Sequence, residues 1–248
     1  LSIRRQRQMC IRDSSLVTGL GVGANVFEWT VDNGPCQNPI STDQVTISVY
    51  DVANPVANAG ADQSLCGSTS TTLSGSNVIA PAIGTWTLVS GNGTVASPNA
   101  PNTQITGMSV GANVFRWTVD NGPCGAPTQD DVTVLVFDPN QPAANAGVDQ
   151  QLCTPTTSTS VTGSSVTFPG TGVWTVVSGT ATITTPNSST TTVTGLGVGV
   201  IVLQWTVNNG PCGAPTNDQV TITLFDSNTP IADAGPDQEI CIPTFPSE

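Results

Sequence analysis

The stretch NVFRWTVDNGPC at residues 113–124 decides the fold of this chain. Phe115, Trp117 and Val119 lie two residues apart, and Arg116 falls on the alternate positions between them. Strict alternation of this kind is typical of a β-strand with one buried face and one exposed face. The Asp-Asn-Gly-Pro that follows supplies the residues that a hairpin turn favours. The segment therefore predicts a strand that enters a β-hairpin.

The same stretch recurs along the chain. Its WTVDNGPC portion returns twice at steps of 88 residues, with one Asp-to-Asn change in the last copy, at 29–36, 117–124 and 205–212. A second motif, first seen as ANAGADQSLC, recurs in altered form at 57–66, 144–153 and 232–241. Self-similarity at a fixed step is the signature of a tandem-repeat protein.

The limits of the repeats follow from linkers in which Asp, three residues and then Pro come after an apolar strand. Residues 1–14 resemble a translated sequencing adapter, and we interpret them as a non-native segment that includes Cys10. The predicted organisation is a C-terminal half of a truncated repeat, two complete repeats and the N-terminal start of a truncated repeat, at 15–55, 56–142, 143–230 and 231–248.

Each complete repeat is predicted to hold about seven strands. In the repeat at 56–142 they are expected at 57–65, 71–74, 85–89, 94–96, 103–106, 113–119 and 132–137. Seven short strands in fewer than 90 residues favour an immunoglobulin-like sandwich. Two tryptophans per repeat are expected to fill its core from opposite sheets: Trp86 with Trp117, and Trp174 with Trp205. The predicted fold is all-β, with tandem immunoglobulin-like (PKD-like) β-sandwiches arranged as a rod.

The phrases ANAGADQ, ANAGVDQ and ADAGPDQ, each followed by Cys, then a TTLSG-type strand and the WTVxNGPC hairpin, resemble PKD-like repeats. Such repeats are immunoglobulin-like modules of long secreted surface proteins, especially in gliding bacteria of the Bacteroidota group. The resemblance covers roughly residues 15–248. It implies a spacer or an adhesive stalk at the cell surface.

Six cysteines remain once Cys10 is set aside, and the chain has no His and no CxxC pair to favour zinc. Disulfides are the natural interpretation, and they imply an extracellular or cell-surface location. One scheme pairs cysteines within repeats, as Cys66–Cys124 and Cys153–Cys212. The other crosses the junctions, as Cys36–Cys66, Cys124–Cys153 and Cys212–Cys241. The first scheme is favoured, because the final strand carries the chain about 25 Å away from the hairpin before the next repeat begins.

Charge and missing residue types exclude several functions. From residue 15 onward there are 16 acidic residues and a single basic one, so nucleic-acid binding is not expected. Lys and His are absent, which excludes His-based triads and Lys Schiff bases. No apolar run is long enough to span a membrane. We expect no catalytic activity in this segment.

The best candidate for a binding site lies at the repeat junctions, where Asp and Asn recur. The candidate ligands are Asp51, Asn58, Asp62, Asp138, Asn145 and Asp149. Oxygen ligands gathered between two sandwiches suit Ca²⁺, which is the one cofactor that the sequence suggests. The alternative is that these side chains make turns and cap strand ends.

The leading functional prediction is a non-catalytic structural and adhesive stalk of a large secreted or cell-surface bacterial protein. Its expected partners are neighbouring repeats of the same chain, with surface glycans or other cell-surface proteins as outside targets. The alternative is a carbohydrate-binding or spacer module of a secreted polysaccharide-degrading enzyme. Phe168 is the aromatic side chain best suited to an exposed sugar platform.

Overall fold

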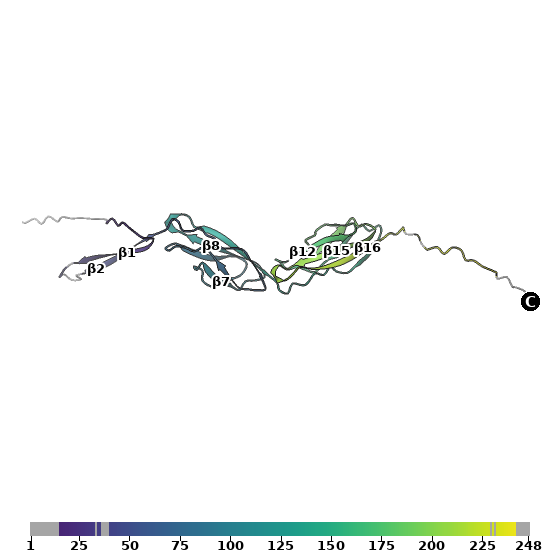
Figure 1. The fold of residues 1–248 in the computed structure, drawn as a ribbon, viewed down its shortest axis with the longest axis horizontal. Helices are drawn as coiled ribbons and strands as arrows, with labels where there is room; N and C mark the ends of the chain where they lie inside the picture. The colour runs from purple at the N-terminus through teal and green to yellow at the C-terminus, as the bar shows by residue number, and fades with distance from the viewer. Residues whose placement is uncertain (1–14, 33, 36–39, 229, 231, 242–248) are drawn as a thin grey trace, which may run out of the picture. The chain divides into compact units, whose positions relative to one another are not determined.

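The computed structural model describes residues 15–32, 34, 35, 40–228, 230 and 232–241, and these are almost entirely β-structure and loops (Figure 1). The predicted non-native segment 1–14 lies outside the described residues. The chain divides into two compact units. The first runs to Pro139 and also includes the turn Gly210–Cys212, and the second holds the remainder. The repeat limits drawn from the sequence stay predictions.

The first unit contains a complete sandwich of seven strands. One sheet has the order β3-β9-β8-β5, with bounds Gln63–Cys66, Thr128–Phe137, Gly111–Asp120 and Ile83–Ser90. The facing sheet has the order β4-β7-β6, with bounds Thr71–Ser74, Asn102–Thr106 and Thr94–Val95. A 3-10 turn, η1 (Gly122–Cys124), joins β8 to β9.

The order of these strands defines an immunoglobulin-like sandwich. The opening strand β3 pairs in parallel with the last strand β9, and every other strand pair is antiparallel. The second, fourth and fifth strands of the sandwich (β4, β6 and β7) form one sheet. The third, sixth and seventh strands (β5, β8 and β9) form the other sheet, with the opening strand β3 at its edge. This is the two-sheet arrangement of the immunoglobulin class. The predicted all-β sandwich is confirmed.

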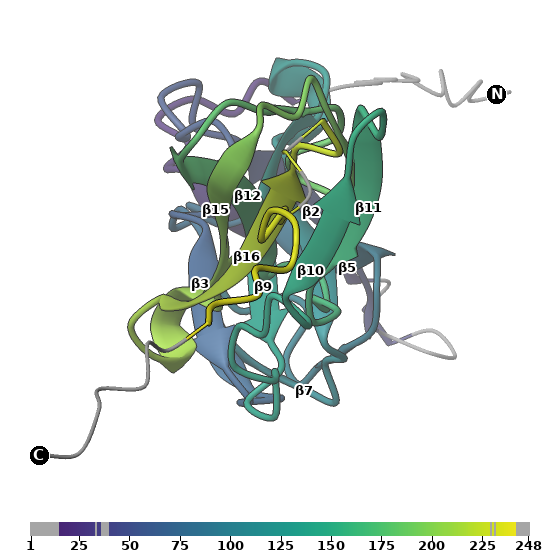
Figure 2. The same cartoon turned by 90° about the vertical axis from the view of Figure 1, so that its right-hand side faces the viewer.

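The second unit repeats the same plan. Its four-stranded sheet runs β10-β16-β15-β12, with bounds Gln150–Cys153, Thr216–Phe225, Gly199–Asn208 and Thr171–Ser178. Its three-stranded sheet runs β11-β14-β13, with bounds Ser158–Thr162, Thr190–Thr194 and Thr182–Ile183. The turn η2 (Gly210–Cys212) follows β15. Figure 2 shows β10 beside β16, with which it pairs in parallel.

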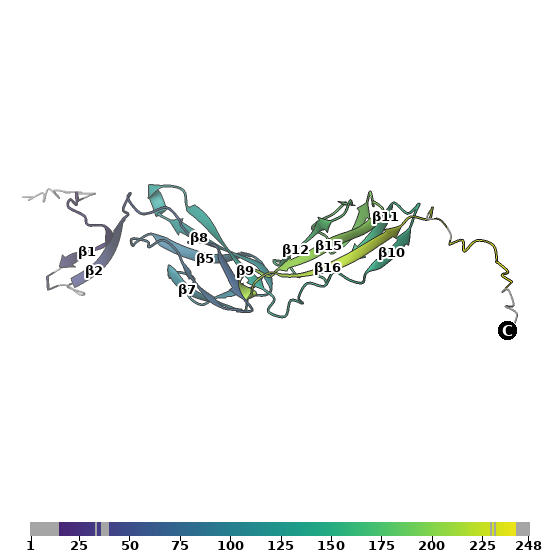
Figure 3. The same cartoon turned by 45° about the vertical axis from the view of Figure 1, so that its right-hand side comes forward.

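A two-stranded sheet precedes the first sandwich. β1 (Gly23–Asp32) and β2 (Ile40–Val49) form an antiparallel hairpin (Figure 3). Its register matches that of β8 and β9, because Trp29 faces Asp43 and Trp117 faces Asp130. The alternating pattern of the recurring motif thus produces the same pairing in both places.

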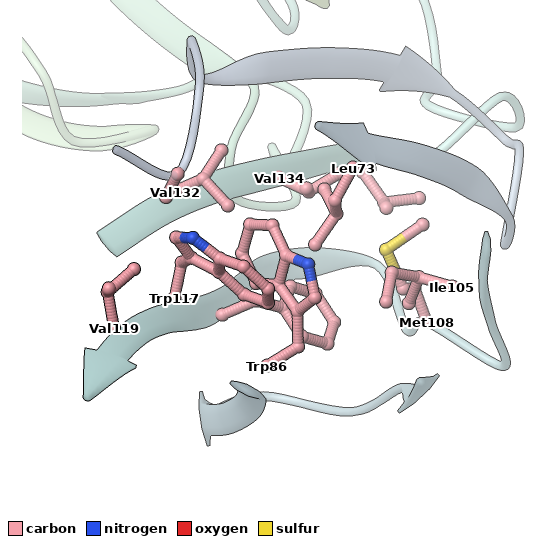
Figure 4. Close-up of a cluster of buried hydrophobic side chains, with 11 residues drawn as sticks. Leu73, Trp86, Ile105, Met108, Trp117, Val119, Val132 and Val134 are labelled. Carbon is pink, nitrogen blue, oxygen red and sulfur yellow. The ribbon is translucent and has the colours of Figure 1, made fainter. Parts of the chain in front are cut away.

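The core of each sandwich is built around its pair of tryptophans, and Figure 4 shows the core of the first sandwich. All four predicted core tryptophans are buried: Trp86, Trp117, Trp174 and Trp205. The prediction that the two tryptophans of each repeat come from opposite sheets was wrong. Trp86 and Trp117 are direct cross-strand neighbours on β5 and β8 of one sheet, with ring centroids 5.0 Å apart. The reason is the sandwich topology. It makes the third and sixth strands (β5 and β8) neighbours in one sheet, so both rings project from the same sheet face.

The opening strand is shorter than the predicted 57–65, since ladder pairing begins only at Gln63. The residues before it are held by side chains instead. The backbone N–H of Ala59 donates to Asp130 Oδ2 at 2.7 Å, and that of Ala57 donates to Thr128 Oγ1 at 2.8 Å. Gly60, with φ at +83°, turns the chain between this segment and β3. These contacts leave no regular backbone ladder over residues 57–62.

Candidate functional site

The candidate site lies where β3 and β9 end side by side. Parallel pairing in register places Cys66 opposite Phe137, each the last residue of its strand. The N–H of Gly67 then donates to the carbonyl of Phe137 at 3.0 Å. A cysteine and an aromatic ring are therefore presented together at one end of the sheet. We call this pair of strand ends the first strand-end site.

The turn Gly210–Cys212 occupies the first strand-end site, within the first compact unit. Cys212 forms a disulfide with Cys66, with the two Cα atoms 4.9 Å apart. Gly210 lies so close to the ring of Phe137 that a Cβ atom there would come within 2.6 Å of it. Gly210 also has φ at +52°, where glycine is favoured. Glycine at this turn position is thus required for contact as well as for backbone conformation.

This bond corrects the predicted pairing Cys66–Cys124 and Cys153–Cys212. Cys66 lies level with Phe137 at the end of β9, whereas Cys124 lies before Thr128 at its start. A ten-residue strand spans about 30 Å, which no disulfide can bridge. The junction-crossing scheme also fails, because Cys66 is bonded to Cys212 and both Cys124 and Cys153 are free and exposed. Cys36 lies outside the described residues, and Cys241 is free and exposed.

A second contact of the same kind lies at η1. A Cβ atom on Gly122 would come within 2.7 Å of the ring of Tyr50, the residue after β2. Asn121 Nδ2 donates to the carbonyl of Asp51 at 2.9 Å, which fixes the turn beside this segment. The aromatic partners of these turns were not predicted from the sequence. Their signal was present, because Tyr50, Phe137 and Phe225 recur at steps of 87 and 88 residues just before each linker.

The predicted calcium ligands of the first copy have backbone partners. Asp51 Oδ1 accepts the N–H of Ala53, and Asn58 Oδ1 accepts that of Gly60, each at 2.8 Å, as in short turns. Asp62 Oδ1 accepts the N–H of a residue in β9 at 2.8 Å, which attaches the opening segment to the last strand. These contacts match the turn-making alternative.

The second copy repeats the pattern. Asn145 Oδ1 accepts the N–H of Gly147, and Asp149 Oδ1 accepts the N–H of Thr221 in β16. Asp138 directly follows β9. Within the part of the chain that the structure describes, no three His, Cys, Asp or Glu side chains are grouped to hold a metal ion. The predicted calcium site formed by Asp and Asn side chains at the repeat junctions stays a prediction.

Both sandwiches have a shallow pocket at the start of the third strand. In the first sandwich it is lined by Val78, Ala80, Ile83 and Asn99, among others. In the second, the corresponding pocket is lined by Val166, Phe168, Thr171 and Asn187, among others. The two pockets differ in that Phe168 stands where the first has Ala80. Phe168 is 64% exposed, as the sequence analysis expected for a sugar platform.

One cross-strand charge pair lies on the outer face of the first sandwich. Arg116 Nε donates to Asp131 Oδ1 at 2.7 Å, and both side chains remain more than a third exposed. The hydrogen bond from Arg116 lowers the pKa of the Asp131 carboxyl, and the same bond raises the pKa of Arg116. The neighbouring Asp130 points to the other side and binds the opening segment. Adjacent carboxylates on opposite faces of a strand cannot act as a catalytic pair.

Among the described residues, no helix has the length and apolar character needed to cross a membrane.

No protein-family model and no curated protein matches the chain. Among solved structures, the PKD domain of KIAA 1837 protein is 28% identical over 36% of this chain and 92% of its own, with a TM-score of 0.31. The PKD domain of human KIAA0319 is 19% identical over 39% and 88%, with a TM-score of 0.30. The titin immunoglobulin tandem A164–A165 is 14% identical over 70% and 98%, with a TM-score of 0.39. All three are PKD or immunoglobulin domains.

Proposed function

We propose that this chain is a non-catalytic stalk segment of an extracellular adhesive protein, in which consecutive sandwiches are joined covalently. The observation that carries the proposal is the disulfide Cys66–Cys212, which connects β3 of the first sandwich to the turn after β15. A bond of this kind persists in an oxidising compartment outside the cytosol. The recurring motifs resemble PKD-like repeats of Bacteroidota surface proteins, which favours a bacterial adhesin as the parent protein.

The bond gives the chain a short covalent load path. Tension that enters before Cys66 passes directly to Cys212, so the segment between the two cysteines carries none of it. That segment corresponds to a sequence separation of 146 residues and contains most strands of both sandwiches. Strands that carry no tension cannot be pulled out of their sheets. A stalk linked in this way would keep these strands in their sheets while it transmits force.

Single-molecule stretching of the full chain by its two ends tests the proposal. With the disulfide intact, full unfolding should release about 500 Å less contour length than in the reduced protein, at ~3.5 Å per residue over the bypassed segment. Cys66→Ser and Cys212→Ser should each behave like the reduced protein. Cys124→Ser and Cys153→Ser are matched controls, since these thiols are free and exposed, and should leave the length unchanged. Equal contour lengths before and after reduction would contradict the proposal.

A second candidate function is carbohydrate binding at the pocket of the second sandwich. It is favoured by the exposed ring of Phe168, because stacking on a sugar needs an accessible aromatic face. A glycan array with the full chain and with Phe168→Ala tests it. Binding that is lost in the variant would support this function, and equal signals from both proteins would exclude the pocket as a sugar site.

A further inference from the structure

The strand end of the second sandwich has the same construction as the first strand-end site, but among the described residues no glycine of a Gly-Pro-Cys turn lies against its ring. Parallel register places Cys153 opposite Phe225, each the last residue of its strand. The N–H of Thr154 donates to the carbonyl of Phe225 at 3.0 Å, as Gly67 does to Phe137. We call the ends of β10 and β16 the second strand-end site.

The first and second strand-end sites differ in how far their aromatic rings are exposed to solvent. Phe137, beneath the turn Gly210–Cys212, is 7% exposed, whereas Phe225 is 50% exposed. Cys66 is bonded, whereas Cys153 is a free, exposed thiol. An exposed aromatic ring beside an exposed cysteine is thus the same pair of groups that a Gly-Pro-Cys turn covers in the first unit.

The contact with a turn glycine is a recurring device and not an accident of one place. Gly122 lies against Tyr50 as Gly210 lies against Phe137, although the rings belong to different residue types. Two of the three aromatic residues at these strand ends, Tyr50 and Phe137, are therefore in contact with a Gly-Pro-Cys turn. Phe225 is the third. In contrast, Gly34 of the first Gly-Pro-Cys turn has no atom within 4 Å of the position a Cβ would take.

We propose that the second strand-end site docks the Gly-Pro-Cys turn of another copy of this module and bonds to its cysteine through Cys153. This inference deepens the proposed function, because it rests on the same junction and names the partner that extends it. The ring of Phe225 would lie under the turn glycine, where any larger residue would overlap it, and Cys153 would face the turn cysteine two residues later.

The bond forms by thiol–disulfide exchange with a small-molecule disulfide. Cys153 and the turn cysteine each give up one proton and one electron to form the S–S bond, and one disulfide such as oxidised glutathione is reduced to two thiols. Docking raises the local concentration of the second thiol, so the correct pair should form faster than any other.

The test incubates the full chain in a buffer of oxidised and reduced glutathione and maps its disulfides by mass spectrometry without reduction. The expected product is a covalent chain of copies in which Cys153 is joined to Cys36 of another copy, because the turn that holds Cys124 already lies against Tyr50 of its own chain. The proposal is overturned if Cys153 carries only glutathione, or joins mainly Cys124, Cys153 or Cys241 of another copy. The Cys66–Cys212 bond in the same map reports on the proposed function separately.

Variants at the ring test docking apart from thiol reactivity. Phe225→Asp should slow the formation of the linked product by about tenfold, as expected for loss of a central aromatic contact. Phe225→Tyr should restore it, because Tyr50 already fills this role at η1. Val148→Asp, at another exposed apolar side chain of the same sandwich, should have no effect. Equal rates for Phe225→Asp and the parent chain would overturn the proposal.

Discussion

The hairpins β1–β2 and β8–β9 begin with strands of almost the same sequence but have different surroundings. The strands GANVFEWTVD and GANVFRWTVD differ at one residue and pair in the same register with their partners. Yet Trp29 is 70% exposed, whereas Trp117 is fully buried. The difference lies in the other strands of the sandwich, which pack over Trp117 and have no equivalent around Trp29 among the described residues.

The two hairpins show that strand register depends on the hairpin itself, whereas burial of the tryptophan depends on the surrounding sandwich. Alternation in the strands is sufficient to set the register, because both hairpins share it although their connecting loops differ in length by one residue. Burial requires close packing from outside the hairpin. A Cβ atom on Gly84 of β5 would overlap the six-membered ring of Trp117, which shows how tightly that ring is enclosed.

Removal of the two equivalent tryptophans should give the largest contrast. We expect Trp117→Ala to lower the free energy of unfolding of its sandwich by ~3–5 kcal/mol, because it leaves a large cavity. Trp29→Ala should change stability by less than about 0.5 kcal/mol, since the side chain is mostly exposed. Urea unfolding of both variants measures the difference. Similar losses in the two variants would show that the β1–β2 hairpin is packed in solution.

A smaller difference in stability is expected between variants at two equivalent asparagines, Asn113 in β8 and Asn25 in β1. Asn113 is fully buried, and its Oδ1 accepts the N–H of Asn92 at 2.9 Å. Asn113→Ala should cost ~1–3 kcal/mol, because a buried donor and its partners lose their hydrogen bonds. Asn25, its equivalent in β1, is only partly buried, so Asn25→Ala should cost less. Thermal melts of the two variants compare them, and an equal loss would refute the role of burial.

The smallest effect is expected where the two strands differ. Glu28 accepts a hydrogen bond from Gln44, and the equivalent pair in the first sandwich is Arg116 with Asp131. Because the folded-state pKa of Asp131 is lowered, its stabilising contribution is present above the ordinary Asp range and is lost as the pH falls through the lowered value. Both side chains are exposed, so Asp131→Asn should shift the Tm near neutral pH by no more than about 2 °C. Melts across the acidic range should show parent and variant converging at low pH, and a growing gap would contradict this.

Local patterns predicted the strands, the two-sheet class and the buried tryptophans. Each of these depends on alternation and turn residues that lie within a few positions of one another. The position of the tryptophans in a single sheet was missed, because it depends on which strands become neighbours. The shortened opening strand was missed because Asp130 and Thr128, about 70 residues away, replace its ladder with side-chain contacts.

The disulfide could not be derived from spacing. Its cysteines are separated by 146 residues, and their approach depends on the parallel pairing of β3 with β9, which brings Cys66 to the far end of the last strand. The last strand does carry the chain away from Cys124, as expected from the sequence. The position of Cys66 at the end of that strand was not predicted. The recurrence of Tyr50, Phe137 and Phe225 before the linkers was the available clue.

Non-reducing peptide mapping of the full chain decides whether the two sandwiches are joined covalently. We expect a peptide that contains Cys66 linked to one that contains Cys212, with Cys124 and Cys153 accessible to alkylation in the native protein. Recovery of Cys66 linked to Cys124, together with Cys153 linked to Cys212, would contradict the Cys66–Cys212 bond.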